Sequence, residues 1–412
     1  MQSQPPFSHF AGLDWAKDHH DVVILDTKGH KVDTFRFEHS AAGWRRWQKK
    51  ISAFPDLAVA IETSAGMVVG NILDSGVAVY PVNPFNAKRY RERHCSSGNK
   101  TDEHDAWSLA DALRVDGHDW KALTEQDPVI TELRLLCRDE VSLIEQRTAL
   151  INQLQQALYE YYPTALEAFD DWTKPFAWKF VVRFPTPQKL SRAGRSAWEK
   201  WLHSHELARP QTYTRRLDLF AKALEFNTKA PVVRAKSLLA VALAKQLSAL
   251  ESQLAIYRER IEEIFAQHPD NALFGSLPGA GPKLAPRLLS EIGSDRALFE
   301  DAQGLQCLAG TAPVHYQSGK VLKVRMRRAC NKSLRHSIHL FADKSRAKCP
   351  WASIYYNAHR ERGKTHSDAL RCLAQRWLKI IWKMWQTGTP YNGEHHLRNQ
   401  MAHGSWLFKK SP

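Results

Sequence analysis

The sequence lacks the features that would direct a protein into or across a membrane. No apolar run approaches the roughly 18 residues that a membrane-spanning helix needs. The first residues, MQSQPPFSHFAGLDWAKDHH, contain no basic segment followed by an apolar one, as a secretory signal would. The six cysteines are scattered and form no C-x-x-C pair, which argues against a disulfide framework and a zinc ribbon. We therefore expect a protein of the reducing cytoplasm that does not bind a membrane.

Positive charge is concentrated in the last third of the chain. Of a formal net charge of +15, residues 268–412 contribute +14, from 23 Lys and Arg against 9 Asp and Glu. Residues 1–125 hold 15 basic against 17 acidic side chains. A basic region favours a polyanionic partner, because each phosphate that it neutralises releases counterions. The alternative is a basic surface that serves only solubility.

The first 125 residues predict a mixed α/β domain. Short alternating or apolar runs predict strands at HFAGLDWA, DVVILD, KVDTFRFEH, LAVAIE and VAVYPV. Capping residues predict that helices begin after Ser40, near Ala65, at Asn83-Pro84 and after Thr101. Three strands followed by alternating helices and strands are typical of a sheet covered by helices.

The rest of the chain is expected to be mostly helical. Residues 126–267 contain two long apolar repeats, which predict either an antiparallel coiled coil or an ordinary helical bundle. Between the repeats lies a basic, aromatic insertion, residues 163–234. Its tryptophans suit either nucleic-acid contact or a small core. Residues 268–387 predict a C-terminal domain of helices and one hairpin, and residues 388–412 a tail with little periodicity that is a candidate for disorder.

Two aspartates stand on a helical stripe that should be buried. In GNKTDEHDAWSLADAL, Asp102 and Asp105 share their spacing with four apolar residues: Ala106, Leu109, Ala110 and Leu113. An unpaired ionised carboxylate on a buried face is very costly. Their position therefore implies cationic partners, a metal ion, or a face that is really an open cleft.

Two further acids stand at or inside apolar strands. Asp14 lies between Leu13 and Trp15, and Glu62 ends LAVAIE. If these strands are neighbours and the helix of Asp102 and Asp105 crosses them, four carboxylates converge, a donor set that suits Mg²⁺ or Mn²⁺ and phosphodiester chemistry. Taken singly, each acid has an ordinary alternative as a helix cap, a first-turn residue or a strand-end ion pair.

The stretch LPGAGPKLA predicts a helix–hairpin–helix element. Gly279 and Gly281 permit a tight turn, and the backbone N–H groups and Lys283 at the start of the next helix would face a phosphate. A plain helix–helix turn is the alternative.

A serine-containing turn opens one of the most basic stretches of the chain. In HYQSGKVLKVRMRRAC, Ser318 and Gly319 are expected to join two strands. A serine that attacks phosphorus needs nearby cations to stabilise the developing charge. The stretch supplies five candidates: Lys320, Lys323, Arg325, Arg327 and Arg328.

These motifs together resemble the DEDD transposases of bacterial insertion sequences, whose RNase H-like domain is related in fold to Holliday-junction resolvases. The resemblance rests on GLDWAK, AIETSAG, YPVNPFNAKRYRE and GNKTDEHDAWSLADAL, and resumes at LPGAGPKLAPRLLSEIG and LAGTAPVHYQSGK, so it covers about three-quarters of the chain. The family usually has Arg/Lys-Gly-Asn after the second hairpin strand, whereas here the sequence is Arg328-Ala329-Cys330-Asn331.

The resemblance implies an RNA-guided DNA recombinase. Asp14, Glu62, Asp102 and Asp105 would hold Mg²⁺ or Mn²⁺, and Ser318 would be the nucleophile that forms a phosphoserine link to DNA. Donor DNA, target DNA and a guide RNA encoded by the element would be the partners. Because strand exchange needs two duplexes, a dimer or tetramer is expected. The alternatives are a metal-dependent nuclease or junction resolvase that activates water, and a nucleic-acid-binding protein without catalysis.

Overall fold

The computed structural model describes residues 7–94, 101–123, 127–225, 229–319 and 321–403. It divides the chain into two compact units, Met1–Glu125 and Gln126–Pro412, each of which is described here by itself. In the described part of the chain, no helix has both the length and the apolar character to cross a membrane.

The first unit is built on one mixed five-stranded sheet with the order β3-β2-β1-β4-β5. Its strands are β1 (His9–Trp15), β2 (His19–Asp26), β3 (Lys31–Glu38), β4 (Leu57–Ile61) and β5 (Ala78–Pro81). The first three strands form an antiparallel meander, whereas β4 and β5 join parallel to β1. This is an RNase H-like α/β arrangement, and it confirms the fold class predicted for this part of the chain.

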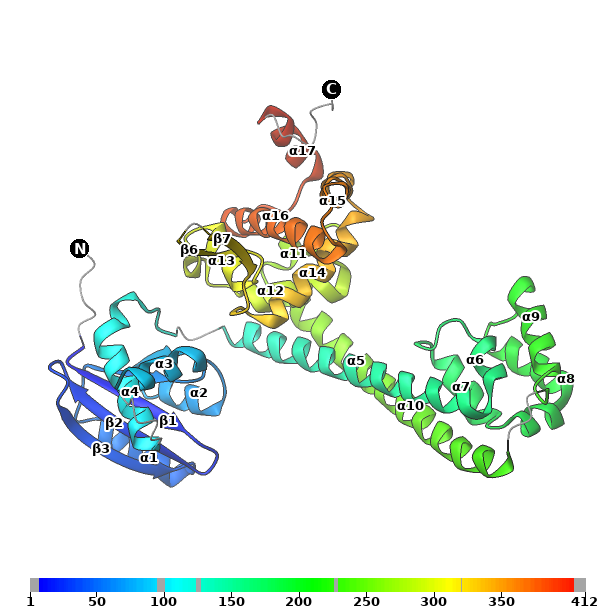
Figure 1. Cartoon of the computed structure of the whole chain (residues 1–412), viewed down its shortest axis with the longest axis horizontal. Helices are drawn as coiled ribbons and strands as arrows, with labels where there is room; N and C mark the ends of the chain where they lie inside the picture. The colour runs from blue at the N-terminus through cyan, green and yellow to red at the C-terminus, as the bar shows by residue number, and fades with distance from the viewer. Residues whose placement is uncertain (1–6, 95–100, 124–126, 226–228, 320, 404–412) are drawn as a thin grey trace. The chain divides into compact units, whose positions relative to one another are not determined.

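Helices cover both faces of this sheet (Figure 1). One face packs against α1 (Ala41–Ile51) and α2 (Met67–Leu73) around the buried Trp47. The other packs against α3 (Pro84–His94) and α4 (Asp102–Asp116), through Leu109 and Leu113 of α4. A 3₁₀ turn, Gly117–Asp119, follows α4.

Two predicted caps begin helices of this unit. The side chain of Ser40 accepts a hydrogen bond from the backbone N–H of Gly43, and Thr101 accepts one from that of His104. Each satisfies one of the backbone donors that a helix start leaves without a partner.

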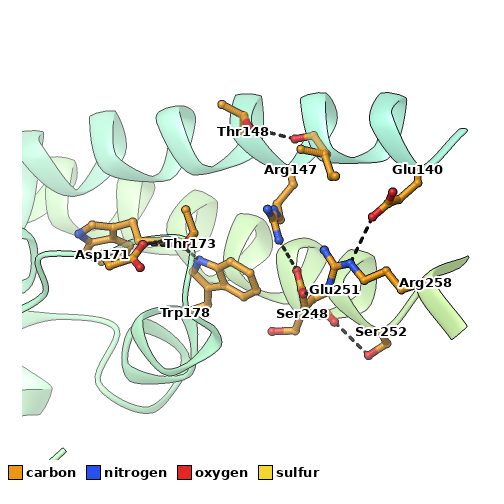
Figure 2. A network of polar contacts seen from close by, with 12 residues as sticks. Glu140, Arg147, Thr148, Asp171, Thr173, Trp178, Ser248, Glu251, Ser252 and Arg258 are labelled. Atoms are coloured by element: carbon orange, nitrogen blue, oxygen red, sulfur yellow. Dashed lines mark hydrogen bonds and ion pairs between the residues drawn. The ribbon is translucent and has the colours of Figure 1, made fainter. Parts of the chain in front are cut away.

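Two long helices organise the second unit: α5 (Pro128–Tyr161) and α10 (Ala230–Gln267). They lie side by side, and four interhelical ion pairs follow an antiparallel register: Glu132 with Arg260, Glu140 with Arg258, Arg147 with Glu251, and Glu160 with Lys236 (Figure 2 shows the middle two). The antiparallel pairing agrees with one of the two arrangements expected from the apolar repeats.

The insertion between these helices forms a small bundle around its aromatic residues. Its helices are α6 (Pro163–Ala168), α7 (Pro175–Arg183), α8 (Pro187–Ser204) and α9 (Pro210–Ala221). All four tryptophans of the bundle are buried: Trp172, Trp178, Trp198 and Trp201. They pack in one core with the adjoining ends of α5 and α10. The structure therefore favours the core alternative for these side chains over direct nucleic-acid contact.

The C-terminal part is mostly helical and packs against the other ends of α5 and α10. Its elements are α11 (Asn271–Gly275), α12 (Gly281–Ile292), the 3₁₀ turn Arg296–Leu298, α13 (Ala302–Leu308), the hairpin β6 (Pro313–Ser318) and β7 (Val321–Met326), α14 (Lys332–Arg346), α15 (Pro350–Glu361) and α16 (His366–Thr387).

Part of the C-terminal tail is helical, contrary to the expectation of disorder. Residues 388–412 showed little periodicity, yet Gly393–Ala402 forms a helix, α17. The side chain of Asn392 caps this helix by accepting from the N–H of His395, and Tyr391 just before it hydrogen-bonds to the indole of Trp351. A local cap and a nearby tertiary contact replace the amphipathic repeat that was missing from the sequence. Residues 404–412 lie outside the described part of the chain.

A buried carboxylate joins three helices of the second unit. Glu140 of α5 accepts hydrogen bonds from Arg258 of α10, at 3.3 Å, and from Arg287 of α12, at 2.8 Å. Two residues earlier on α5, Arg138 donates two hydrogen bonds to the carboxylate of Glu291 of α12. Buried charges are tolerated when paired in this way, so these contacts set how α12 sits on the long helices.

The pairing of Glu251 generates a pH-dependent prediction. Although burial alone raises the pKa of Glu251, hydrogen bonds from Arg147 and Arg258 lower it below its ordinary value. A lowered carboxyl pKa stabilises the fold above the unfolded-state pKa, and this contribution is lost as pH falls through the folded-state value. We expect Glu251→Gln to lower the free energy of unfolding by about 1–3 kcal/mol at pH 7. Urea titrations should show that the deficit narrows below about pH 4; a deficit independent of pH would contradict this ion-pair account.

Candidate active site

The acids predicted on strands lie side by side at one end of the sheet. In the parallel ladder of β1 and β4, Leu13 pairs with Ile61, so the next residues of the two segments, Asp14 and Glu62, lie side by side. On the other side of β1, Asp14 pairs with Asp21 of β2. Two neighbouring strands and the residue that follows a third thus place Asp21, Asp14 and Glu62 in one row across the sheet.

Helix α4 crosses this end of the sheet at very close range. A Cβ on Gly12 would lie 1.9 Å from the carbonyl oxygen of Ala106 and 2.6 Å from the backbone nitrogen of Ala110, so only glycine permits the contact. Because alternate residues of a strand face the same side, Asp14 shares the α4 side of the sheet with Gly12. Asp105 directly precedes Ala106, so this contact sets the N-terminal part of α4 on the face of the sheet that carries Asp14.

The two helix acids differ in burial. Asp105 is buried, as the stripe predicted, and it accepts hydrogen bonds from Arg91 of α3 at 3.0 and 3.1 Å. Asp102, in contrast, has a side chain that is 51% exposed, because it stands at the first residue of α4. The expectation that both lie on a buried face is therefore wrong for Asp102.

A fifth acid, Asp21, was missed by the sequence analysis. Arg36 of β3 donates to both of its carboxylate oxygens at 2.9 Å, and the same guanidinium lies 3.6 Å from Asp102. His19 lies 3.7 Å from Asp21 and 3.8 Å from Asp102. The sequence did contain a signal for Asp21, because this acid stands at the start of an apolar run much as Asp14 stands at the end of one. No such signal marked Arg36 or His19.

The arrangement of acids is chemically suited to a divalent cation. One ligand atom from each of His19, Asp21 and Asp102 lies within 4.8 Å of the other two, a spacing that could hold a metal ion. Among the described residues this group contains only Asp102 of the four predicted acids; Asp14, Glu62 and Asp105 are not part of it. Carboxylate oxygens are the ligands that Mg²⁺ and Mn²⁺ prefer. The guanidinium groups of Arg36 and Arg91 now balance part of this negative charge. The pKa of the Arg36 guanidinium is raised, mainly because this group donates hydrogen bonds to the Asp21 carboxylate.

The predicted nucleophile lies in the second unit, at the end of an exposed hairpin. Ser318 is the last residue of β6 and pairs with Val321, and Gly319 follows with the left-handed φ of +56° that suits glycine. By register, Ser318 shares one face of the hairpin with Tyr316, Lys323 and Arg325. The Arg325 guanidinium lies 5.3 Å from the centre of the Tyr316 ring.

The remaining cations of the basic run follow this hairpin. Arg327 is half-buried and Arg328 is exposed just after β7, whereas Lys320 lies outside the described residues. Asn331 then begins α14 by accepting from the N–H of Leu334, and its side chain donates to Glu291 at 2.6 Å.

The glycine-rich turn precedes α12, as predicted. Gly279 and Gly281 have φ values of +86° and +56°, and a Cβ on Gly279 would approach the carbonyl oxygen of Lys344 to 3.0 Å. Helix α12 begins without a capping side-chain hydrogen bond and without an acid in its first turn, where Lys283 is exposed. Such a helix start can accept an anion.

Comparison with known proteins decides the family. Residues 11–163 match a family model described as Transposase, for DEDD proteins of the IS110 type, and residues 271–357 match one described as Transposase IS116/IS110/IS902 family. The "Mini-circle putative transposase for IS117" of Streptomyces coelicolor is 33% identical over 389 residues, 92% of this chain and 94% of the relative. The chain belongs to the IS110 family of insertion-sequence transposases.

Two further relatives span different shares of the transposase. An insertion element IS900 uncharacterized 42 kDa protein of Mycobacterium paratuberculosis is 26% identical over 93% of this chain and 97% of its own length. A putative transposase, y4uE, of Sinorhizobium fredii is 32% identical over 48% of this chain and 57% of its own length.

Membership of this family makes the chain a DNA strand-transfer enzyme, and its DEDD family implies a divalent metal ion.

The pairing of Asp105 predicts separate effects on stability and on metal response. Without metal, Asp105→Asn should lower the free energy of unfolding by about 1–3 kcal/mol, because Arg91 loses a charged partner. Mg²⁺ should raise the melting temperature of the unaltered transposase but not that of Asp105→Asn. Asp119→Asn is the matched control, since its side chain is 79% exposed. An undiminished Mg²⁺ response in Asp105→Asn would exclude this residue from the metal site.

Proposed function

We propose that the transposase cuts and rejoins DNA through a covalent phosphoserine intermediate on Ser318, with a divalent metal ion at Asp14, Glu62, Asp102 and Asp105. The observation that carries the proposal is the hairpin. It presents the Ser318 hydroxyl in an exposed turn, on the face that also carries Lys323 and Arg325. A structural turn would need neither the hydroxyl nor the cations.

The chemical step conserves the number of phosphodiester bonds. The Ser318 oxygen bonds to phosphorus as the bond from phosphorus to one sugar oxygen breaks. The serine proton is removed and the departing sugar oxygen gains one, so no net proton is consumed. Lys323 and Arg325 stabilise the negative charge that develops on the phosphate oxygens. A sugar hydroxyl of another strand then attacks the phosphoserine, which rejoins the DNA and restores the serine.

The carboxylate cluster would hold Mg²⁺ or Mn²⁺ through oxygen ligands from Asp14, Glu62, Asp102 and Asp105. A bound divalent cation neutralises phosphate charge and orients the scissile group. Asp21 has a different role in this proposal. Through Arg36 it positions Asp102, because one guanidinium contacts both carboxylates.

Other basic groups would hold the DNA backbone. The turn at Gly279 and Gly281 offers backbone N–H groups at a helix start, with Lys283 beside them, as a helix–hairpin–helix phosphate site does. Lys320, Arg327 and Arg328 extend the cationic run around the serine. Contacts of this kind supply affinity for phosphate without reading sequence.

A guide RNA encoded by the element would supply the sequence specificity for donor and target DNA. The strongly basic last third of the chain supports a second polyanionic partner. A dimer or tetramer would align two duplexes. The long helices support self-association, because they expose large apolar side chains: Leu135, Tyr159, Leu238 and Ile256.

Replacement of Ser318 tests the nucleophile directly. With guide RNA, Mg²⁺ and cognate DNA, the unaltered transposase should give a protein–DNA adduct that survives denaturation, and Ser318→Ala should abolish both the adduct and strand cleavage. DNA and RNA affinities should change little, because one hydroxyl contributes little to a large polyanion interface. Peptide mapping should place the added mass between Val314 and Lys320.

Ser8→Ala is a suitable control, because this serine lies in the first unit just before β1, at the opposite end of the strand from Asp14. It should retain both the adduct and cleavage. Cleavage that persists in Ser318→Ala, with no adduct from the unaltered transposase, would instead favour hydrolysis by activated water.

A further inference from the structure

The helical insertion carries a cation-lined cavity that none of the motifs above includes. The cavity has a volume of about 520 Å³ and is lined by Lys179, Val182 and Arg183 of α7 and by Lys245 and Ser248 of α10. On each helix the lining residues are three or four positions apart, so they share one face. Figure 2 shows Ser248 on α10 near Trp178 of α7, one residue before Lys179.

The charges of this cavity are not balanced within it. Three lining side chains are basic and no acid lines it. The described chain offers no ion-pair partner to Lys179, Arg183 or Lys245, although Arg183 also lies over the ring of Phe184 at 5.6 Å. In contrast, other cations of the same region are paired, as Arg215 is with Asp170 and Lys236 with Glu160.

The buried tryptophans explain why these cations lie together on the outside. Ala177, Trp178 and Val181 face the core, which leaves Lys179, Val182 and Arg183 exposed on the remaining surface of α7. Helix α10 presents Lys245 to the same cavity while Leu243 and Leu247 face the core. The aromatic side chains of the insertion thus form its apolar interior, and some of its basic side chains line the cavity on the outside.

We propose that this cavity binds the phosphodiester backbone of a nucleic acid, with Lys179, Arg183 and Lys245 as its phosphate ligands. Lysines act as mobile point charges and an arginine offers a fork of donors, which together suit a run of phosphate oxygens. Val182, 39% exposed, gives the cavity an apolar wall against which a sugar can lie. The site would extend nucleic-acid binding beyond the C-terminal part, and it depends neither on the metal site nor on Ser318.

The test compares two triple variants of the full chain. K179Q/R183Q/K245Q removes the three cavity cations, and K189Q/R192Q/K222Q removes two lysines and one arginine that are exposed on α8 and at the end of α9. Binding of duplex DNA and of structured RNA is measured at several salt concentrations. The logarithm of the association constant falls linearly with the logarithm of the salt concentration. For duplex DNA, loss of three phosphate contacts should make this slope shallower by about 2–3 in the cavity variant than in the control variant. Its affinity should fall by about tenfold or more relative to the control variant.

The two nucleic acids distinguish the source of the phosphates. A loss confined to DNA identifies a DNA site, a loss confined to RNA identifies an RNA site, and a loss with both identifies a shared site. Equal affinities and salt slopes of the two triple variants with both nucleic acids would overturn the proposal. Because all the substituted residues are exposed, both variants should melt at the temperature of the unaltered chain.

Lysine acetylation of the unaltered transposase gives an independent readout. Bound nucleic acid should protect Lys179 and Lys245 severalfold from the reagent, while Lys189 and Lys222 keep their reactivity. Equal reactivity of Lys179 and Lys245 with and without nucleic acid would also overturn the proposal. Neither measurement involves strand cleavage, so the result does not depend on the nucleophile.

Discussion

The candidate active site depends on one steric constraint, the contact between β1 and α4 at Gly12. No larger residue fits there, because its Cβ would lie inside the backbone of the helix. This contact fixes the height of α4 above the sheet and therefore the distance of Asp105 from the strand acids. Electrostatics then completes the arrangement. Arg91 of α3 and Arg36 of β3 balance carboxylates that would otherwise repel one another.

The two kinds of side chain on which the proposed function depends lie in different units of the chain. The first unit gathers acids on a rigid sheet, whereas the second presents a serine and its cations on an exposed hairpin. In the second unit, Glu140 joins α5, α10 and α12 through two arginines. The C-terminal elements and the insertion bundle pack against opposite ends of the same two long helices, which act as their common support, and each does so through its own apolar core. Some cations of this support are buried in ion pairs, such as Arg287, whereas others face outward, such as Lys179, Arg183 and Lys245, as expected for a protein that handles polyanions.

Much of this architecture could be predicted from the sequence, because it depends on local signals. Alternating strands, the caps Ser40 and Thr101, and the turn at Gly319 all lie within a few residues of what they determine. The roles of Asp21 and Arg36 could not be predicted, since they depend on the pairing of β2 with its neighbours. The exposure of Asp102 depends on where α4 begins relative to the sheet. Helix α17 was missed because a cap and tertiary contacts, not periodicity, support it.

We propose that Asp14 of β1, Glu62 just after β4, and Asp102 and Asp105 of α4 form one divalent-metal site. Crystals of the full-length transposase soaked in Mn²⁺ and measured at the manganese absorption edge test it most directly. We expect an anomalous peak at coordination distance, about 2.1 Å, from oxygens of Asp14, Glu62, Asp102 and Asp105. The Arg36 or Arg91 side chain should move away from any carboxylate that the ion takes over. A fully occupied peak elsewhere, with both arginine pairs intact and no density at these acids, would contradict it.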